Sequence, residues 1–594
     1  MKKNKLTIFL SLLVLFTLPT FLSAQTDTLD LGAESAANLS AVINADTVEG
    51  GVIANQNRVY RLQRGFFYIL KETIKINGSF KMIATDGEGR PPILAPGINE
   101  DNSSIGRFVE LFGKNANVEF HDIYFLGIKQ DGEISLAANS GITVNNKMNL
   151  KIRNCIFDGY GARGIQVAKA GAWSNIDVQD SKFRNIQFPG GSWLYGQAFK
   201  TVSNTTPLDT IKFVNNSFMA CGAYIFGVSG YVNHGVFDHN TIVYGIGNTF
   251  LTAYNTNIEI TNNIVYSAFT NAGFKQAVYG DWFYPRPDTI SSGVIVVNIP
   301  DTITYNDTTQ YFGRGVSYIV DTAQTVQPSM VSDALRKFEV NHNAYYYPEE
   351  LYNYIDAYND TVTSKITVAF PYSHEVLHRF ERPQFINRYT MEIIRNGKLQ
   401  KVSPGVVIDT LTIWNENPDF KGADVVSHID SVIWKLDEIL HKKITADRWT
   451  YKMTYPPAWP LPEDLAYTNS TLLTASTKGF PLGDLNWFPE KKQEWLTGLE
   501  KIDNVIPNKI ELSQNYPNPF NPVTKINFKL TKSSKVTLKV FNILGQEVAT
   551  LVNKQLNSGT YNVDFNASKL ASGMYIYQLN AGDVSISKKM TLLK

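Results

Sequence analysis

The sequence predicts an all-β chain in which a solenoid of short stacked strands is followed by a partly helical cover and a small β-sandwich. Strand-like runs alternate at period two along much of the chain, and a short pattern around Asn, Asp or His recurs at irregular distances. The 41 glycines and a dense scatter of Asn, Asp and Thr favour turns between short strands. With 43% hydrophobic and 18% charged residues, the 594-residue chain has a globular composition, which excludes a disordered chain.

The first 24 residues have the features of a secretion signal. Lys2, Lys3 and Lys5 precede an apolar run over 6–18, and small residues follow up to Ala24. Because this run is too short to span a bilayer, we predict a signal peptide over 1–24 that is cleaved after Ala24. No later stretch stays apolar for about 18 residues, so we expect no transmembrane segment in the mature chain.

The charge is balanced in total but unevenly distributed. Without the leader, 52 basic side chains stand against 54 acidic ones. Residues 511–594 carry a net charge of +6, which leaves the rest of the mature chain at −8. Nothing in this distribution attracts nucleic acid, so we expect no nucleic-acid partner.

A six-residue pattern recurs from about residue 118: apolar, any, Asn/Asp/His, any, any, apolar. Its polar residues are Asp122, Asn154, Asp180, Asn215, His239, Asn262 and His342, at spacings of 32, 26, 35, 24, 23 and 80 residues. Repeats of this length indicate a solenoid in which each rung buries its apolar face against its neighbours. The polar residue fits a tight bend in the left-handed region, where we expect stacked side chains to hydrogen-bond from rung to rung.

Together these features resemble a right-handed parallel β-helix of the pectate-lyase-like kind. On this resemblance we place the β-helix at 25–350, with a loop insertion at about 281–335. The repeat is lost after residue 350, and we expect a mixed cover over 351–500 that extends the β-helix. Apolar residues at helical spacing predict an amphipathic helix over 423–443 within this cover.

The resemblance implies a fold that hosts polysaccharide lyases and hydrolases, although the fold alone does not carry the function. Elimination on a uronic-acid polymer needs a base near the sugar C5 proton and a cation that neutralises the adjacent carboxylate. Outward positions in the rungs supply catalytic candidates, with a lysine of depressed pKa as the base; they are Arg163, Lys200 and Lys275. Aromatic residues on loops supply candidates for stacking on sugar rings; they are Trp193, Tyr195, Trp282 and Tyr284.

These residues leave the reaction open. The Asn-Thr-Asp and Gly-His-Gly elements of polygalacturonases are absent, and the Asp-rich calcium cluster of pectate lyases is not evident. We therefore assign no metal ligand, and Ca²⁺ is expected only if the protein is a lyase. A non-catalytic surface adhesin or structural scaffold is the alternative function. Cys155 and Cys221 fall at different offsets in the repeat, and whether they pair stays open.

The chain changes character after a linker at 501–508. Residues 509–594 form short alternating strands between turns, which predicts a small Ig-like β-sandwich. The segments 515–522, 541–547 and 570–575 resemble the type IX secretion sorting domain, type A. The resemblance implies Sec export, recognition by the type IX machinery at the outer membrane, and a protein that is secreted or attached to the cell surface. The sorting-motif residues are Tyr516, Pro517, Asn518, Pro519, Phe520, Asn521, Pro522, Gly545 and Gly573.

Overall fold

The structure is a computed structural model, and the predicted signal peptide lies outside the residues that it describes. These are 27–99, 104–130, 132, 140–187, 196–202, 206–222, 225–228, 232–245, 250–252, 257–268, 290–291, 294–295, 302–305, 308–311, 337–363, 365–368, 374–377, 382–383, 385, 406–441, 450–497, 500–503, 507–568 and 570–593.

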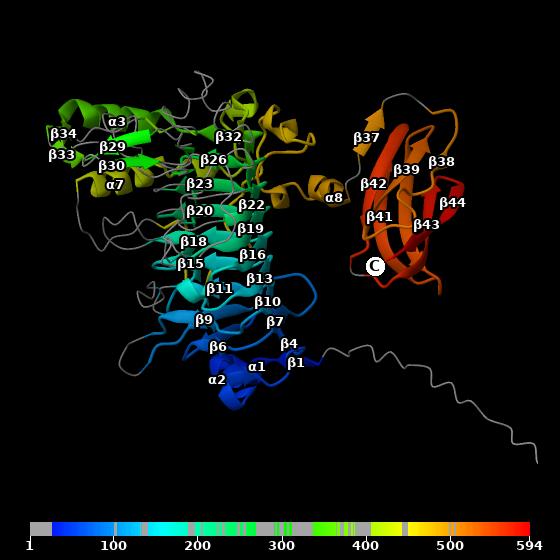
Figure 1. The fold of residues 1–594 in the computed structure, drawn as a ribbon, viewed down its shortest axis with the longest axis horizontal. Coiled ribbons are helices and arrows are strands. Elements are labelled where there is room, and N and C mark those ends of the chain that lie inside the picture. Colours follow the sequence, from blue (N-terminus) through cyan, green and yellow to red (C-terminus); the bar gives the residue numbers. More distant parts are fainter. Residues whose placement is uncertain are drawn as a thin grey trace, which may run out of the picture.

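Three long sheets of stacked strands form the predicted parallel β-helix (Figure 1). The eleven-stranded sheet comprises β1 (Thr28–Leu31), β4 (Val59–Leu62), β7 (Phe80–Ala84), β10 (Ala116–His121), β13 (Met148–Arg153), β16 (Ser174–Gln179), β19 (Leu208–Val214), β22 (Val232–Asp238), β25 (Asn257–Thr261), β31 (Lys337–Asn341) and β35 (Val406–Ile408). The ten-stranded sheet comprises β5 (Phe67–Leu70), β8 (Ile93–Pro96), β11 (Tyr124–Leu126), β14 (Ile156–Asp158), β17 (Lys182–Arg184), β20 (Ser217–Cys221), β23 (Thr241–Gly245), β26 (Ile264–Tyr266), β32 (Asn343–Tyr346) and β36 (Ile413–Asn415).

The nine-stranded sheet completes each rung. It comprises β6 (Ile74–Ile76), β9 (Arg107–Leu111), β12 (Ser140–Val144), β15 (Arg163–Val167), β18 (Gln197–Thr201), β21 (Phe226–Val228), β24 (Phe250–Thr252), β27 (Ile290–Ser291) and β28 (Val294–Ile295). The last two strands, which lie in the predicted insertion, pair antiparallel. Because β35 and β36 belong to the stacked sheets, the β-helix continues past residue 350. Three separate hairpins are β2 (Thr47–Val48) with β3 (Val52–Ile53), β29 (Thr302–Tyr305) with β30 (Thr308–Tyr311), and β33 (Lys365–Val368) with β34 (His374–Leu377).

A residue with positive φ separates the eleven-stranded from the ten-stranded sheet in seven rungs. These residues are the seven polar residues of the sequence repeat, and their φ angles lie between 49° and 60°. Asn and Asp tolerate this left-handed conformation better than other residues with a side chain. The repeat therefore marks the corner of each rung, as predicted.

Among the bend residues, Asn154 donates its Nδ2 to Asp122 of the preceding rung, as predicted, but the continuous ladder of side chains lies one residue beyond the bend. Asn216, Asn240, Asn263 and Asn343 follow the bend residue in four successive rungs and are fully buried. Each of the first three donates its Nδ2 to Oδ1 of the next, at 3.0, 3.0 and 2.9 Å. The residue after the bend turns inward, where an unpaired amide would be costly, so this position carries the ladder.

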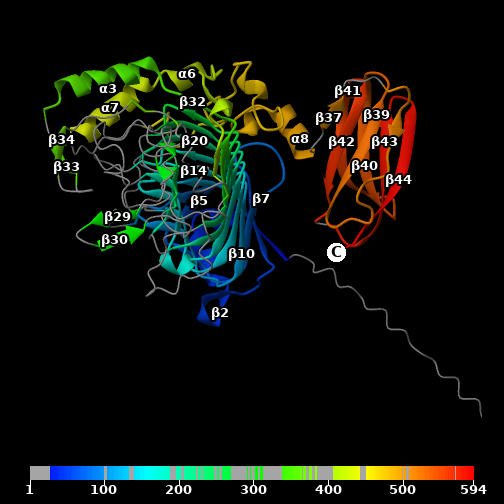
Figure 2. The same cartoon turned by 45° about the horizontal axis from the view of Figure 1, so that its top comes forward.

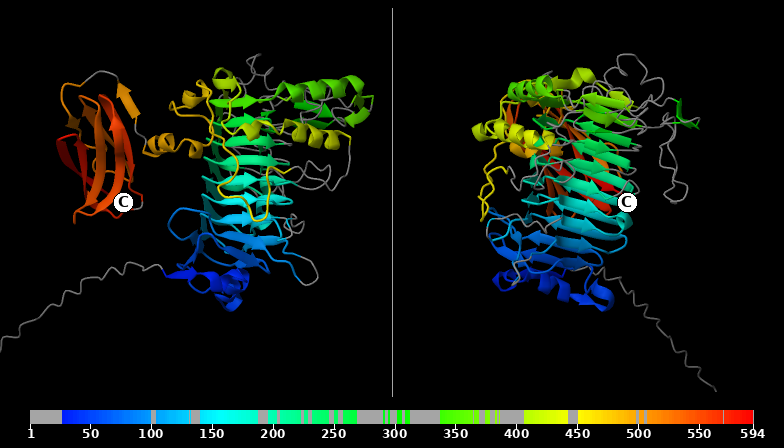
Figure 3. Two further views of the ribbon diagram at one scale, coloured as in Figure 1. Left: turned by 180° about the vertical axis from the view of Figure 1, so that it is seen from behind. Right: turned by 90° about the vertical axis from the view of Figure 1, so that its left-hand side faces the viewer.

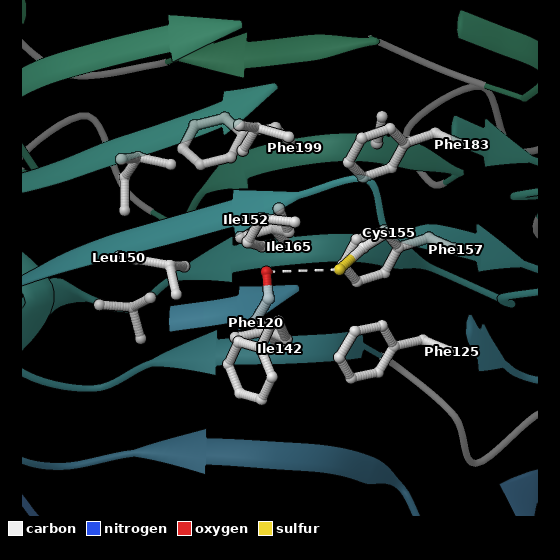
Figure 4. Packing of buried hydrophobic residues seen from close by; sticks show 14 of the residues in the cluster. Phe120, Phe125, Ile142, Leu150, Ile152, Cys155, Phe157, Ile165, Phe183 and Phe199 are labelled. Atoms are coloured by element: carbon white, nitrogen blue, oxygen red, sulfur yellow. Dashed lines mark hydrogen bonds between the residues drawn. The ribbon is translucent and has the colours of Figure 1, made fainter. Parts of the chain in front are cut away.

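Stacked aromatic rings fill part of the interior of the β-helix (Figure 4). Phe125, Phe157, Phe183 and Phe218 occupy the same position in successive strands of the ten-stranded sheet, with ring centroids 4.8 to 5.1 Å apart. Cys155 and Cys221 are buried and free, and the Cys155 thiol donates to the Phe120 carbonyl at 3.5 Å. In-register stacking thus buries identical side chains against one another in adjacent rungs.

Helices close the two ends of the β-helix. At the amino-terminal end, α1 (Ala33–Ala36) and α2 (Leu39–Ala45) lie against β5 and β6, with Leu39 and Ile43 in the core. Near the other end, α3 (Glu349–Thr361) packs on α7 (Ile429–Leu440) (Figure 2). The helix predicted over 423–443 is present as α6 (Ala423–Val426) and α7, and α8 (Pro489–Thr497) follows later.

An extended segment, residues 450–488, runs over the outer face of the ten-stranded sheet (Figure 3); we call it the strap. Its apolar side chains pack on outward residues at both ends of the sheet, with Tyr467 and Leu482 against Val243 and Tyr266 at the carboxy-terminal end. Near the amino-terminal end, the strap packs against Tyr124 and its neighbours. The strap therefore covers an apolar face that would otherwise be exposed to solvent.

A buried charged cluster joins the middle of the strap to the sheet. Arg184 lies 3.5 Å from Asp158 on the neighbouring strand and 3.2 Å from Glu463 of the strap, and all three side chains are at most 3% exposed. Arg184 also donates to the carbonyl of Tyr451 at 3.0 Å, and Tyr124 donates its hydroxyl to Asp158 at 2.6 Å. Burial raises the pKa of Asp158, while the charge of Arg184 opposes that rise.

Residues 500–592 form the predicted β-sandwich of two four-stranded antiparallel sheets. One sheet comprises β37 (Glu500–Asp503), β42 (Gly559–Asn566), β39 (Val523–Leu530) and β38 (Glu511–Leu512). The other comprises β41 (Glu547–Leu556), β40 (Ser534–Asn542), β43 (Gly573–Ala581) and β44 (Val584–Leu592). The two sheets enclose their own hydrophobic core, separate from that of the β-helix. The predicted linker at 501–508 overlaps β37, which adds an edge strand to the sandwich.

Removing one rung of the asparagine ladder should destabilise the β-helix. Asn240→Ala removes the hydrogen bonds that this amide makes with Asn216, Asn263 and the Phe213 carbonyl, and the buried backbone N–H of Asn216 loses its acceptor. We expect the free energy of unfolding to fall by about 3 kcal/mol, since each buried group left unpaired costs roughly 1–3 kcal/mol. Urea unfolding of residues 25–594 measures the change, with the exposed Asn233→Ala in the same rung as the control. Equal midpoints for the two variants would contradict a stabilising ladder.

Removing the central cation should weaken the attachment of the strap. Arg184→Met leaves the buried carboxylates of Asp158 and Glu463 facing each other, which we expect to cost about 3–5 kcal/mol. Thermal and urea unfolding measure this loss. Arg382→Met is the matched control, because its ion pair with Asp356 is exposed and contributes less than about 1 kcal/mol. A loss no larger than that of the control would show that the cluster does not hold the strap.

Candidate functional site

Polar side chains form a strip on the outer face of the nine-stranded sheet. Ile142, Ile165 and Phe199 point into the core (Figure 4), so the residues that follow them point outward. These are Thr143 of β12, Gln166 of β15 and Lys200 of β18, which lie opposite one another in register and continue from Glu110 of β9. Adjacent strands are about 4.8 Å apart, so the strip presents one polar group per rung.

A parallel column lies three residues earlier in the same strands. It comprises Arg107, Ser140, Arg163 and Gln197, again in register. Hydrogen bonds join the two columns within a rung. Ser140 and Thr143 share a hydroxyl hydrogen bond of 2.7 Å, and Arg163 donates to the side-chain oxygen of Gln166. Arg163 also donates Nε to Gln197 at 3.2 Å, so its guanidinium is held in a defined orientation.

The uncharged side chains of β12, β15 and β18 in these two columns are buried. Ser140, Thr143, Gln166 and Gln197 are buried although they project from the outer face of the sheet, whereas Arg163 and Lys200 are half-buried. The two cations are thus the more accessible groups of β15 and β18 on this face. Buried hydroxyl and amide groups beneath them provide fixed hydrogen-bonding partners rather than mobile ones.

Lys200 has an unusual acid–base property. Burial, together with the nearby charge of Arg163, lowers the pKa of the Lys200 ammonium to about 8. Arg163 donates to Gln166, and Gln166 lies opposite Lys200 on the neighbouring strand. The guanidinium of Arg163 is therefore close to the ammonium group of Lys200. Lys200 also lies over Gly227 of β21, where an added Cβ would stand 2.7 Å from Lys200 Cδ. The glycine therefore leaves room for the lysine side chain.

Two of the predicted catalytic residues, Arg163 and Lys200, meet on this face. The third, Lys275, and the predicted stacking residues Trp193, Tyr195, Trp282 and Tyr284 lie outside the described residues. Sequence reasoning missed the polar neighbours that complete the strip. Alternation around each inward residue, as in Ile142-Thr143-Val144 and Ile165-Gln166-Val167, is the signal that could have found them.

Neither column fits a divalent cation. Within the described part of the chain, no group of three or more His, Cys, Asp or Glu side chains is placed to hold a metal ion. The two columns contain one carboxylate, Glu110, which is paired with Arg107, and their other members are cationic or neutral, whereas Ca²⁺ prefers several carboxylate and carbonyl oxygens. We therefore derive no step through Ca²⁺.

The predicted sorting-motif residues cluster at one end of the β-sandwich. Asn515 is buried; it donates Nδ2 to the Pro517 carbonyl at 3.0 Å and to the Thr524 hydroxyl at 2.9 Å. Phe520 is also buried, and its amide donates to the Thr591 carbonyl at 3.0 Å. The motif residues from Tyr516 to Pro522 form a loop, Gly545 lies in the turn between β40 and β41, and Gly573 begins β43.

Comparison with protein families identifies the carboxy-terminal domain. Residues 514–592 match the family described as the secretion system C-terminal sorting domain. No curated protein matches the chain. The sorting domain shows that the protein is handled by type IX secretion machinery and is secreted or attached to the outer-membrane surface. Among the helices described, none is long and apolar enough to cross a membrane.

The pKa of Lys200 should depend on Arg163. In Arg163→Met, the nearby positive charge is lost, so we expect the pKa of Lys200 to rise from about 8 towards that of an exposed lysine. Lysines labelled by reductive methylation with ¹³C can be titrated by NMR, and a Lys200→Arg variant assigns the signal. Arg107→Met removes a cation from the same face, three rungs from Lys200, and should leave the Lys200 titration unchanged. An identical titration in Arg163→Met and the wild type would contradict this coupling.

Proposed function

We propose that the protein is an exported β-helix protein that binds an acidic polysaccharide along the strip on the nine-stranded sheet. The observation that carries the proposal is the pair of half-buried cations, Arg163 and Lys200, above buried hydroxyl and amide groups. A guanidinium binds a carboxylate through two parallel hydrogen bonds, and an ammonium group attracts it as a point charge. A uronic-acid polymer carries one carboxylate on each acidic sugar, so it can engage both cations at once.

The stacked rungs suit a polymer better than a small molecule. The strip places one polar side chain in each rung, from Glu110 through Thr143 and Gln166 to Lys200, along the axis of the β-helix. Successive sugars of an extended chain can therefore each meet a polar group. The cellular location of the protein is consistent with this ligand, because a protein exported to the outer-membrane surface encounters extracellular polymers directly.

Elimination of the bound polymer is a second candidate function, favoured by the pKa of Lys200 near 8. The neutral amine of Lys200 would take the C5 proton of a uronate while Arg163 neutralises its carboxylate. The electron pair of the C5–H bond forms the C4–C5 double bond as the C4–O4 bond breaks. The departing O4 takes a proton from water, and the hydroxide that remains takes the C5 proton from Lys200, so the products are a new chain end and an unsaturated uronate.

Binding and elimination should respond oppositely to pH. Binding depends on the ammonium form of Lys200, so affinity should fall as the pH rises through about 8. Elimination depends on the amine, so its rate on bound polymer should rise over the same range. Calorimetry with polygalacturonate and alginate measures binding, neutral dextran serves as the uncharged control, and near-ultraviolet absorbance detects the unsaturated product.

Matched variants locate the site. Lys200→Met and Arg163→Met should each weaken binding about tenfold or more, the loss expected for a charge-assisted contact. Lys151→Met should have no effect, because Lys151 lies in the same rung as Arg163 but on the eleven-stranded sheet, paired with Glu119 at 3.0 Å. Failure of the wild type to bind any acidic polymer, or equal losses in all three variants, would overturn the proposal. Binding without product at any pH would leave the adhesin or scaffold role and exclude the lyase.

A further inference from the structure

Three segments far apart in the sequence meet at one end of the sorting domain. β40 ends at Asn542, which lies opposite Tyr575 near the start of β43, and Gly573 pairs with Leu592 at the end of β44. Phe520 bridges to Leu592, so the loop over 516–522 reaches the same end. The loop, the turn over 543–546 and the start of β43 therefore form one surface.

Some residues of these segments have a role in the fold. Phe520 and Tyr575 are buried in the core of the sandwich, and Asn515 fixes the loop through its hydrogen bonds. Gly545 has φ of +79° and Gly573 has φ of +154°, conformations that favour glycine. A Cβ at either glycine would meet no atom within 4 Å, so backbone conformation and not packing accounts for them.

Other residues at this end have no role in packing. Tyr516, Ile543 and Leu544 are 82%, 72% and 78% exposed, and Met574 and Leu593 are about half exposed. We call these five residues the apical patch. Single exposed apolar residues are common, but a cluster at one end of a small domain is typical of an interaction site. Four of the five lie in the segments that identify the sorting domain.

We infer that the apical patch is the surface by which the type IX secretion machinery binds this chain. The occupant is a protein of that machinery, because residues 514–592 match the sorting domain and contain four residues of the patch. Near the patch, Lys589 is exposed on the outer sheet face opposite Ile576, while Lys525, which bridges to Tyr516 through the backbone, is paired with Asp564 at 3.6 Å. The partner surface therefore provides an apolar recess.

Charge substitutions in the patch test this inference in the full chain. Ile543→Lys/Leu544→Lys, expressed in a bacterium with a type IX system, should lower the surface and secreted fraction about tenfold or more, with the protein retained in the periplasm. Val584→Lys is the matched control, because Val584 is an exposed apolar residue in the hairpin at the opposite end of the sandwich. It should be exported like the wild type.

Independent measurements separate docking from folding and self-association. The purified full-length double variant should unfold at the wild-type temperature, because both side chains lie outside the core. Wild-type export of the double variant overturns the inference, and so does a loss of export matched by a fall in unfolding temperature.

Sedimentation of the full chain provides the third readout. A dimer that the double variant abolishes while its export is normal would assign the patch to a second copy and overturn the inference. Failure of polysaccharide binding would leave this result unaffected, because the patch shares no residue with the strip.

Discussion

The left-handed bend between two of the three sheets is the constraint on which the β-helix depends. It turns the chain sharply at the same point in seven rungs and directs the next side chain inward. Where that residue is Asn, its amide ties each rung to the next, and where it is Cys155 or Ser181 a smaller group occupies the column. Parallel strands alternate at period two, so a slip of one residue would expose the ring column and bury the outward face. The bend therefore fixes the register of all the remaining columns of stacked side chains.

Because the register is fixed, the outward side chains of the three sheets form faces of different chemical character. The ten-stranded sheet is largely apolar outside and depends on the strap, which returns from far along the chain to cover it. On the eleven-stranded sheet, outward charges alternate in sign, so Glu119 lies between Lys81 and Lys151 and is paired with both. On the nine-stranded sheet, Arg107 pairs with Glu110, and the positive charge of Arg163 lies close enough to Lys200 to lower the pKa of its ammonium group.

The sequence allowed the corners of the fold to be predicted but not the contacts between distant segments. Asn, Asp and His at the bends mark a local conformation, so all seven were predictable from spacing and residue type. The ladder was placed one residue too early, because its column begins with Ile123, Cys155 and Ser181 and becomes asparagine only from Asn216 onward. The strap could not be predicted, since Glu463 reaches Arg184 across 279 residues with no periodic signal. Loops of unequal length likewise concealed the position of Gly227 beside Lys200.

The sorting domain constrains the function of the β-helix only through location. Its core is separate from the core of the β-helix, and the two parts meet through groups such as the ion pair of Lys554 with Glu494 at 3.0 Å. The secretion machinery can therefore recognise the sorting domain without any contribution from Arg163 or Lys200. Delivery beyond the outer membrane restricts the ligands that the protein meets to molecules outside the cell, which include polymers too large to enter it. Within that class, the proposed acidic polysaccharide rests on two adjacent cations that lie near buried hydrogen-bonding groups.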